Sequence, residues 1–388
     1  MAVYYLLSIS IFIISLLSLS SCDTTMTLPF QMKINYRNDY VVFMELTNPN
    51  AHTTIHPFVF LVGLITYIPD GSTPILRDDF IIHRDMNRTY QLYQSNIQIT
   101  NYEFPLYYYG SYSKGDDYEY SGIDTQLNFA FKPQIETTSF VYQLYNSHII
   151  DRMIFGINYK EDFREGGNMY IGGIPIEYTE NKRYGECDVI DGNSMCRVNE
   201  VYFGDVHYKE YVYNKTSKVV FRLYHEGIVV PHDYFIYLKE KVFHNQYYSV
   251  GLRNREFIYC RINTEQDRTF FATYPKNINF VLDKYILHIP ILKMLYKGEA
   301  FQIENGGTDN HFFFGNQFLQ YFTTVFNYEK EKVQFYIKEG NEDIKFIPIV
   351  NTTKDISNIL LINTIGLSFG LMMIVFKMKN VSIEYSQK

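Results

Sequence analysis

The chain has 388 residues, of which 46% are hydrophobic and 20% are charged, a composition typical of a globular protein rather than a disordered one. Its formal net charge of -7 argues against a protein that binds duplex nucleic acid, because such proteins need a clustered cationic face. The 37 Tyr and 31 Phe residues favour strands over helices. We therefore expect a mainly β protein of about two domains with no nucleic-acid partner.

The N-terminus predicts export. Residues 3–19 are almost wholly apolar and are followed by the small residues Ser20 and Ser21 and by Cys22. An apolar run that ends in small residues is typical of a signal peptide, which we place at residues 1–21. Two alternatives remain, since the run would also serve as a retained membrane anchor, and residues 19–22 fit a bacterial lipoprotein cleavage box.

Short alternating runs between residues 33 and 345 predict a mainly β ectodomain. Paired glycines and similar turn residues separate these runs. Helical patterns are few and short. The clearest strand patterns lie at residues 40–44, 58–62, 211–213, 219–221 and 332–337, and the helical ones at residues 232–244 and 316–322.

The cysteines fit an oxidising compartment. Cys187 and Cys196 are close enough in the chain to close a short hairpin disulfide. Cys260 is then left over, unless it pairs elsewhere or stays a buried thiol. Three sequons predict N-glycosylation on the exported side. They begin at Asn87, Asn214 and Asn351.

The C-terminus predicts a membrane anchor. Residues 356–376 contain no charge and match the roughly 20 residues that a bilayer core needs. Lys377 and Lys379 follow directly, so residues 377–388 are expected to form a cytoplasmic tail. The prediction is a single-pass membrane protein with a lumenal or extracellular ectodomain. The alternative, a buried core helix, fits poorly with a segment of this length beside the terminus.

Several segments of the chain carry recognisable motifs. Residues 311–329 (HFFFGNQFLQYFTTVFNYE) resemble a segment of two apolar residues, Gly-Asp-x-Phe-Leu and then Tyr-x-Val-Phe-Asp, that is typical of the pepsin-like aspartic protease family. Residues 332–335 resemble its closing strand, and residues 165–175 resemble its Gly-Gly hairpin. The stretch that begins at Tyr109, together with residues 120–125, is similar to its flap hairpin.

The resemblance implies a two-lobed fold and a particular chemistry. The lobes are expected at residues 31–180 and 181–345. In that family two Asp carboxyl groups, one from each lobe, lie about 3 Å apart and share one proton. One acts as a general base on water and the other as a general acid. Like charges at that distance cannot both ionise, which separates their pKa values.

The Asp-Thr-Gly and Asp-Ser-Gly turns that hold those carboxyl groups are missing from this sequence. Counting back from Pro69 places the first Asp position at Phe60 without a gap, or at Leu61 with one deletion. Keeping Gly63 as the turn glycine favours Leu61. A leucine side chain cannot transfer a proton.

The second Asp position is also occupied by another residue type. Counting back from Pro231 places it at Arg222. No acid occurs between residues 210 and 226, and none occurs between residues 45 and 70, so no small shift of register restores one. An arginine stays protonated and cannot act as a base. The partner that a buried Arg222 would need is not evident from the sequence.

The sequence therefore predicts a pepsin-like scaffold without its acid pair, a pseudo-protease that binds a peptide or protein through the cleft between its lobes. Two other readings remain: an active aspartic protease with an atypical acid pair, and a structural or adhesive surface glycoprotein. We expect no cofactor and no metal. His52 and His56 have a helical ligand spacing, but Pro57 favours a loop there.

Overall fold

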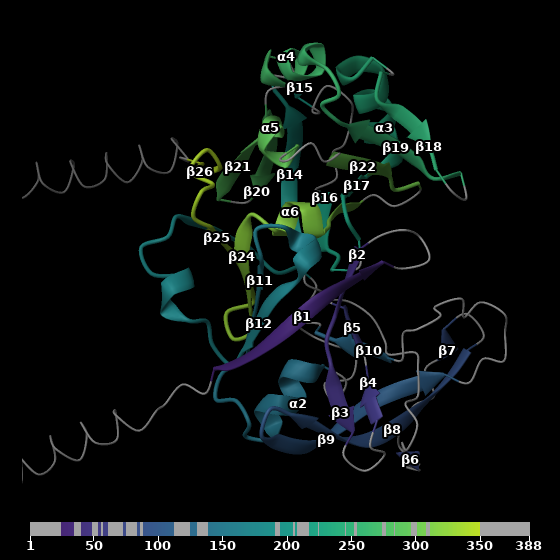
Figure 1. Cartoon of the computed structure of the whole chain (residues 1–388), viewed down its shortest axis with the longest axis vertical. Coiled ribbons are helices and arrows are strands. Elements are labelled where there is room, and N and C mark those ends of the chain that lie inside the picture. The colour runs from purple at the N-terminus through teal and green to yellow at the C-terminus, as the bar shows by residue number, and fades with distance from the viewer. Residues whose placement is uncertain are drawn as a thin grey trace, which may run out of the picture. The chain divides into compact units, whose positions relative to one another are not determined.

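The computed structural model of the chain consists of β-strands joined by short helices and turns (Figure 1). The chain divides into two units, residues 1–347 and residues 348–388. The structure describes residues 25–34, 40–48, 53–55, 57–60, 73–74, 84–85, 88–111, 125–129, 139–190, 195–204, 206–207, 217–223, 225–244, 246–251, 254–273, 277–282, 284–295, 301–307 and 311–349.

One sheet combines strands from distant parts of the chain. β1 pairs with β12, β12 with β11, and β11 with β24, so early strands lie beside late ones. β24 is buried at every position, because other elements cover both of its faces. The strand order is β10 (Thr125–Asn128), β5 (Pro57–Phe60), β2 (Tyr40–Phe43), β1 (Met26–Ile34), β12 (Gly167–Ile171), β11 (Ile154–Tyr159), β24 (Phe322–Asn327), β25 (Lys332–Ile337) and β13 (Tyr184–Asp188).

A second sheet is built around one long hairpin. β8 (Arg88–Ile99) and β9 (Tyr102–Ser111) pair along their length, and Thr100 in the turn between them has a positive φ of 53°. The helix α2 (Phe140–Asn146) packs against this hairpin, with the ring centroids of Phe140 and Phe104 6.1 Å apart. The other strands are β3 (Leu46–Asn48), β4 (Thr53–Ile55), β6 (Thr73–Pro74) and β7 (Arg84–Asp85).

The third sheet forms the upper half of Figure 1. β23 (His311–Phe314) lies at its centre, parallel to β16 (Ser217–Phe221) and antiparallel to β17 (Ile228–Val230). β22 (Phe301–Asn305) runs parallel to β17 on the other side. The remaining strands are β14 (Met195–Phe203), β15 (Val206–His207), β18 (Tyr248–Val250), β19 (Glu256–Cys260), β20 (Asn277–Leu282), β21 (Tyr285–Pro290) and β26 (Lys345–Pro348).

The helices are short, as the sequence predicts. The pattern at residues 232–244 is confirmed as α3 (His232–Tyr237), which continues into a π-helical turn, η5 (Leu238–Val242). The pattern at residues 316–322 is confirmed only as α6 (Asn316–Leu319), because Phe322 already belongs to β24. The others are η2 (Phe163–Glu165), η3 (Ile176–Tyr178), α4 (Glu265–Thr273) and α5 (Ile291–Met294).

Aromatic side chains fill the core. Phe155 stacks on Phe326 with centroids 5.5 Å apart, and it contacts Phe129 at 4.6 Å. The ring centroids of Phe314 in β23 and Phe318 in α6 lie 4.0 Å apart. Large aromatic rings bury much apolar area for each residue. The high content of Phe and Tyr therefore accounts for much of the buried core.

Several predicted segments lie outside the described residues: the signal peptide, the membrane helix at residues 356–376 and the cytoplasmic tail. In the part of the chain that the structure describes, no helix is long and apolar enough to cross a membrane. The expected boundary between residues 180 and 181 lies between η3 and β13. The first sheet contains strands from both sides of that boundary, so the two expected lobes share it.

Candidate functional site

Arg222 directly follows the last residue of β16. Its backbone N–H donates a 2.9 Å hydrogen bond to the carbonyl oxygen of Phe314, which extends the pairing of β16 with β23 by one residue. Its guanidinium carbon lies 3.2 Å from the ring centroid of Phe313, a cation–π contact. The side chain is half-buried. The residue at the expected second Asp position is thus a cation stacked on an aromatic ring.

Arg222 lies on the face of the third sheet that points away from the main core. Successive side chains of a strand alternate between faces. Val219 and Phe221 belong to the main core, whereas Val220 packs with Val229 and Phe313 in a separate small cluster. This small cluster therefore shares its face of the sheet with Arg222.

The turn after Arg222 is fixed by the start of α6. The backbone N–H groups of Gly315, Asn316 and Gln317 donate hydrogen bonds of 2.8–3.0 Å to carbonyl oxygens of residues 225–227. Gly315 is required at this crossing, since a Cβ there would lie 2.4 Å from the carbonyl oxygen of His225. These bonds hold the Arg222 turn against the Gly-Asn motif that carries the family resemblance.

Asn316 connects this turn to strands from the first half of the chain. Its Oδ1 accepts a 2.5 Å hydrogen bond from the hydroxyl of Tyr159 in β11. Its Nδ2 donates to the carbonyl oxygens of Tyr40 in β2, at 2.8 Å, and Leu223, at 3.2 Å. Asn316 is fully buried, so these bonds satisfy its amide where water cannot.

The strand β2 is also bonded directly to this turn. The N–H of Val42 donates a 3.0 Å hydrogen bond to the carbonyl oxygen of Leu223. Beyond β2 the chain alternates between buried Met44 and Leu46 and exposed Glu45. Glu45 is thus an exposed acid two residues beyond the end of β2.

A buried ionic group lies three residues beyond Arg222. The Nε2 of His225 is 3.0 Å from Oε2 of Glu304, and Arg255 donates to both carboxylate oxygens of Glu304. Burial alone would raise the pKa of Glu304, but the hydrogen bonds and charges of His225 and Arg255 outweigh it and lower the pKa to about 2. Glu304 therefore stays ionised in acid, and it ties β22 to the Arg222 turn.

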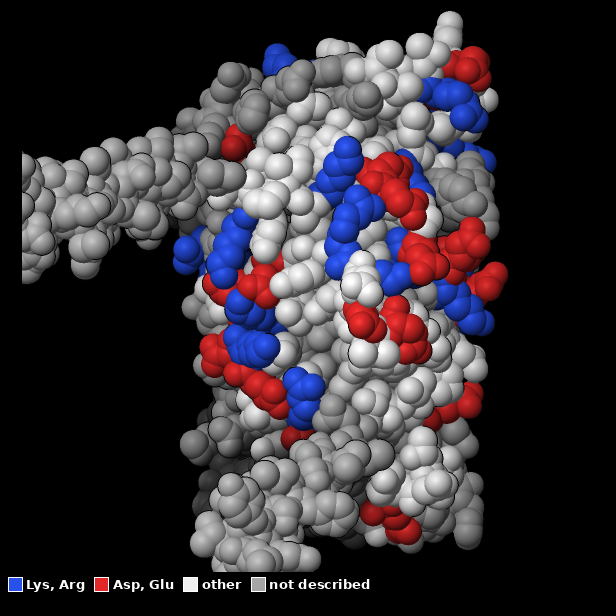
Figure 2. Space-filling view, turned by 90° about the vertical axis from the view of Figure 1, so that its left-hand side faces the viewer, with Lys and Arg blue, Asp and Glu red and all other residues white. Residues whose placement is uncertain are grey.

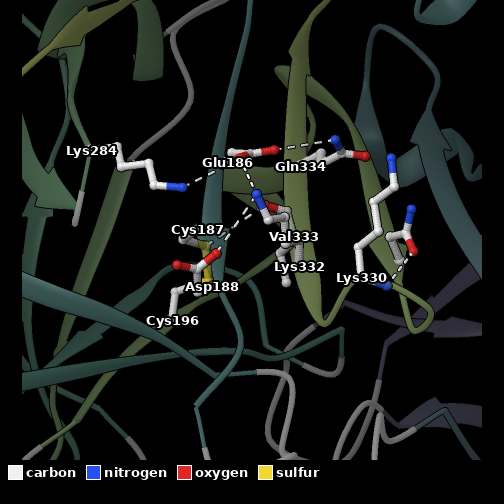
Figure 3. Close-up of polar contacts among 10 residues, drawn as sticks. Glu186, Cys187, Asp188, Cys196, Lys284, Lys330, Lys332, Val333 and Gln334 are labelled. Atoms are coloured by element: carbon white, nitrogen blue, oxygen red, sulfur yellow. Dashed lines mark hydrogen bonds and ion pairs between the residues drawn. A yellow bond between two sulfur atoms is a disulfide. The ribbon is translucent and has the colours of Figure 1, made fainter.

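A second polar group lies beside the disulfide (Figure 3). Lys332 and Lys284 both point toward Glu186, with Lys284 at 3.7 Å, and Lys332 also lies 3.8 Å from Asp188. Burial would raise the pKa of Glu186, but Lys332 lowers it overall. These pairs join β13 and β25 to the start of β21.

Lysine, arginine, aspartate and glutamate side chains are interleaved on the face that Figure 2 turns toward the viewer. Two ion pairs of the described residues involve the segment after β25. Lys182 pairs with Glu339 at 2.5 Å and Lys293 with Asp343 at 3.8 Å. Exposed pairs of this kind contribute little to stability and do not form a site.

The structure locates some of the predicted site residues and not others. Cys187 and Cys196 form a disulfide with their Cα atoms 5.6 Å apart, and Cys260 is a buried free thiol. Tyr109 lies in β9, where it pairs with Leu92 of β8, and residues 120–124 of the expected flap lie outside the described residues. Leu61 and the sequon residues Asn87, Asn214 and Asn351 lie outside the described residues.

Chemically, the described residues around the Arg222 turn form a set of hydrogen bonds and ion pairs that includes two permanent cations, Arg222 and Arg255. Arg222 cannot accept a proton at any physiological pH. Within the described residues no group of three or more His, Cys, Asp or Glu side chains is placed to hold a metal ion. Sequence reasoning missed the links of Asn316 and Glu304, because their partners lie 49 or more residues away in the chain.

No protein-family model matches the chain, and no curated protein matches it. Among solved structures, the crystal structure of aspartic proteinase from Irpex lacteus is similar, with a TM-score of 0.60 at 11% sequence identity. The match covers 82% of this chain and 99% of that chain. At this identity the likeness concerns the fold alone. The chain thus has a mainly β fold similar to that of the pepsin-like aspartic proteinases, as its motifs imply.

Proposed function

We infer that this protein is a non-catalytic relative of the aspartic proteases, a membrane-anchored glycoprotein that binds a peptide or protein segment between its lobes. The observation that carries the proposal is the position of Arg222 at the end of β16, stacked on Phe313. A proton-sharing mechanism needs two carboxyl groups, and a guanidinium can neither give up its proton nor share one.

Glu45 does not change this reasoning. Glu45 is a single exposed carboxylate, and a single carboxylate cannot share a proton with the guanidinium of Arg222. The proposal therefore holds whether Leu61 or Glu45 occupies the first-lobe position.

Binding of an extended segment is supported by the architecture. A fold made of sheets from two lobes offers strand edges and a junction between lobes, and both are common places for peptide ligands. The Asn316 links to Tyr40 and Tyr159 fasten the junction with buried hydrogen bonds. A site whose strands are already held together suits ligand binding, because fewer protein groups lose conformational freedom when the ligand binds.

The membrane anchor and the glycans belong to the same proposal and rest on the sequence. The uncharged run at residues 356–376 and the three sequons are the supporting observations. Digestion of the natural protein with an N-glycosidase is expected to lower its mass, and protease added to sealed microsomes is expected to remove only the short C-terminal tail, because the ectodomain lies inside. An unchanged mass together with digestion of the ectodomain in sealed microsomes would contradict this topology.

The binding role is tested with the full chain in detergent micelles, against a displayed library of random heptapeptides. The proposal predicts enrichment of a related set of peptides, competed by one another. Enrichment of none would favour the structural or adhesive role. Cleavage of library peptides by the chain would favour the active protease.

A further inference from the structure

We propose that Lys338 is a positioning residue of the ligand site, because its amine holds the helix α6 in the place from which α6 fixes the Arg222 turn. This role rests on the binding function proposed above. Lys338 sets the shape of the site and does not contact the ligand itself. The hydrogen bonds at the two ends of α6 support the proposal.

The amine of Lys338 lies among three main-chain carbonyl oxygens. Lys338 directly follows β25 and is half-buried, and its Nζ donates hydrogen bonds of 2.6 Å to Tyr159 and 2.8 Å to Gln320. A longer contact of 3.4 Å reaches the carbonyl oxygen of Lys160. A lysine ammonium has three N–H donors, so three acceptors match it. The ends of β11, α6 and β25 therefore meet at one nitrogen atom.

Lys338 binds the C-terminal end of α6 twice. Gln320 directly follows the last residue of α6, and its carbonyl oxygen accepts from the Lys338 side chain. The backbone N–H of Lys338 donates a 3.1 Å hydrogen bond to the carbonyl oxygen of the next residue, Tyr321. The last carbonyl groups of a helix have no partner within the helix, and lysine side chains commonly supply one.

Tyr159 connects the two ends of the same helix. Its hydroxyl donates to Oδ1 of Asn316 at the start of α6, and its carbonyl oxygen accepts from the Lys338 amine that also binds Gln320 at the end. Asn316–Leu319 is a single turn of about 6 Å. A shift at its C-terminal end is therefore felt at Asn316.

The start of α6 holds the turn that carries Arg222. The backbone N–H groups of Asn316 and Gln317 each donate a 2.8 Å hydrogen bond, to the carbonyl oxygens of residues 225 and 226. Asn316 also donates through Nδ2 to the carbonyl oxygen of Leu223. Removing the Lys338 amine should therefore loosen these bonds, although Lys338 itself does not touch the turn.

The charge state of Lys338 is compatible with this role. Burial lowers the pKa of Lys338 to about 8, although the negative charge of Glu161 acts in the opposite direction. Most of the amine is therefore protonated at neutral pH. The neutral form keeps two N–H donors, which is enough for the shorter bonds to Tyr159 and Gln320.

The test measures amide hydrogen exchange, residue by residue, in the full chain in detergent micelles at pH 7. Lys338→Met removes the amine and keeps an unbranched side chain that is one atom shorter. Exchange of the Asn316 and Gln317 amides should become about tenfold faster than in the wild type, because the turn opens more often. Lys345→Met, which removes an exposed lysine of β26, is the matched control and should leave both amides unchanged.

Chemical rescue separates positioning by the amine from a general loss of stability. Methylammonium has N–H donors and should restore slow exchange in Lys338→Met by donating to the same carbonyl oxygens. Tetramethylammonium at equal concentration has the same charge and no N–H group, so it should restore nothing. If Lys338→Met does not fold alone, the two cations are compared for restoring the folded chain. Folding in methylammonium only would support the proposal, and folding in neither would contradict it.

The affinity for peptides is measured separately, with peptides that the wild-type chain enriches. Lys338→Met should bind them more weakly, and methylammonium should restore binding. Unchanged exchange at Asn316 and Gln317, or an equal response to both cations, would overturn the proposal. Equal peptide affinities of Lys338→Met and the wild type would show that Lys338 does not position the site. If exchange responds as expected but the wild type enriches no peptide, the binding function fails and the role of Lys338 in holding the turn stands.

Discussion

The hydroxyl of Tyr159 donates a 2.5 Å hydrogen bond to Oδ1 of Asn316, although 157 residues of chain separate the two. The same asparagine donates through Nδ2 to Tyr40 and Leu223. One buried amide thus bonds to β11, to β2 and to the turn that carries Arg222. Asparagine suits this position because it accepts on one atom and donates on the other.

Replacing Asn316 with Asp should therefore destabilise the protein. A carboxylate cannot donate, so it would face the carbonyl oxygens of Tyr40 and Leu223 in a fully buried position. We expect a loss of about 2–4 kcal/mol at neutral pH, measured by chemical denaturation, and a smaller loss in acid where the carboxyl group is protonated. Tyr159→Phe, which removes one donor only, should cost about 1–3 kcal/mol. An Asn316→Asp protein as stable as the wild type would show that these bonds do not join the strands.

The Glu304 group should make stability depend on pH in acid. The pKa of Glu304 is about 2 in the folded protein and near 4.5 in the unfolded chain, so its stabilisation is complete above pH 4.5 and is lost as the pH falls toward 2. That window corresponds to about 3 kcal/mol. The measurement is the difference in unfolding free energy between wild type and Glu304→Gln from pH 6 to pH 2. The difference should shrink across the window, and a constant difference would contradict the assignment.

The Cys187–Cys196 disulfide joins β13 of the first sheet to β14 of the third, next to the Glu186 ion pairs (Figure 3). It closes a short loop, so removing it with a Cys187→Ser, Cys196→Ser double variant should cost about 2–3 kcal/mol. Reductant should lower the stability of the wild type by a similar amount and leave the double variant unchanged. Cys260→Ala is the matched control, because that buried thiol is unpaired and its removal should preserve the sensitivity to reductant.

Gly315 gives a test of the crossing between α6 and the Arg222 turn. Gly315→Ala would bring a Cβ within 2.4 Å of the carbonyl oxygen of His225, so the turn must shift. We expect a loss of about 1–3 kcal/mol from overpacking. Gly307→Ala, where no atom lies within 4 Å of the added Cβ but φ is +63°, controls for backbone strain alone. Equal effects of the two substitutions would argue against a close crossing.

Local patterns in the sequence predicted local structure well. The alternation at residues 332–337 matches β25, and residues 219–221 fall within β16. The pairing of Cys187 with Cys196 is confirmed, since both cysteines lie close together in the chain and face each other from neighbouring strands. These features depend on period, spacing and turn chemistry, which are all visible in a short stretch of sequence.

The site could be predicted only in part, because its contacts join distant segments. The position of Arg222 followed from a local count back from Pro231, but its aromatic partner Phe313 is about 90 residues further along the chain. The link from Asn316 to Tyr40 spans 276 residues. The helix predicted at residues 316–322 is too long, because Phe322 belongs to β24. Every residue of that strand is buried, and this burial outweighs the helical spacing of the sequence. The contact with Phe313, the link to Tyr40 and the end of the helix all depend on packing between segments that are distant in the sequence.

The central claim is that Arg222 stands where a proton-sharing acid would be needed. The most direct measurement is hydrolysis of mixed peptides by the full chain between pH 3 and pH 6, with and without pepstatin, followed by mass spectrometry. The account predicts no pepstatin-sensitive cleavage in the wild type, and none in Glu45→Gln or Arg222→Leu. Pepstatin-sensitive cleavage by the wild-type chain that disappears in either variant would contradict it.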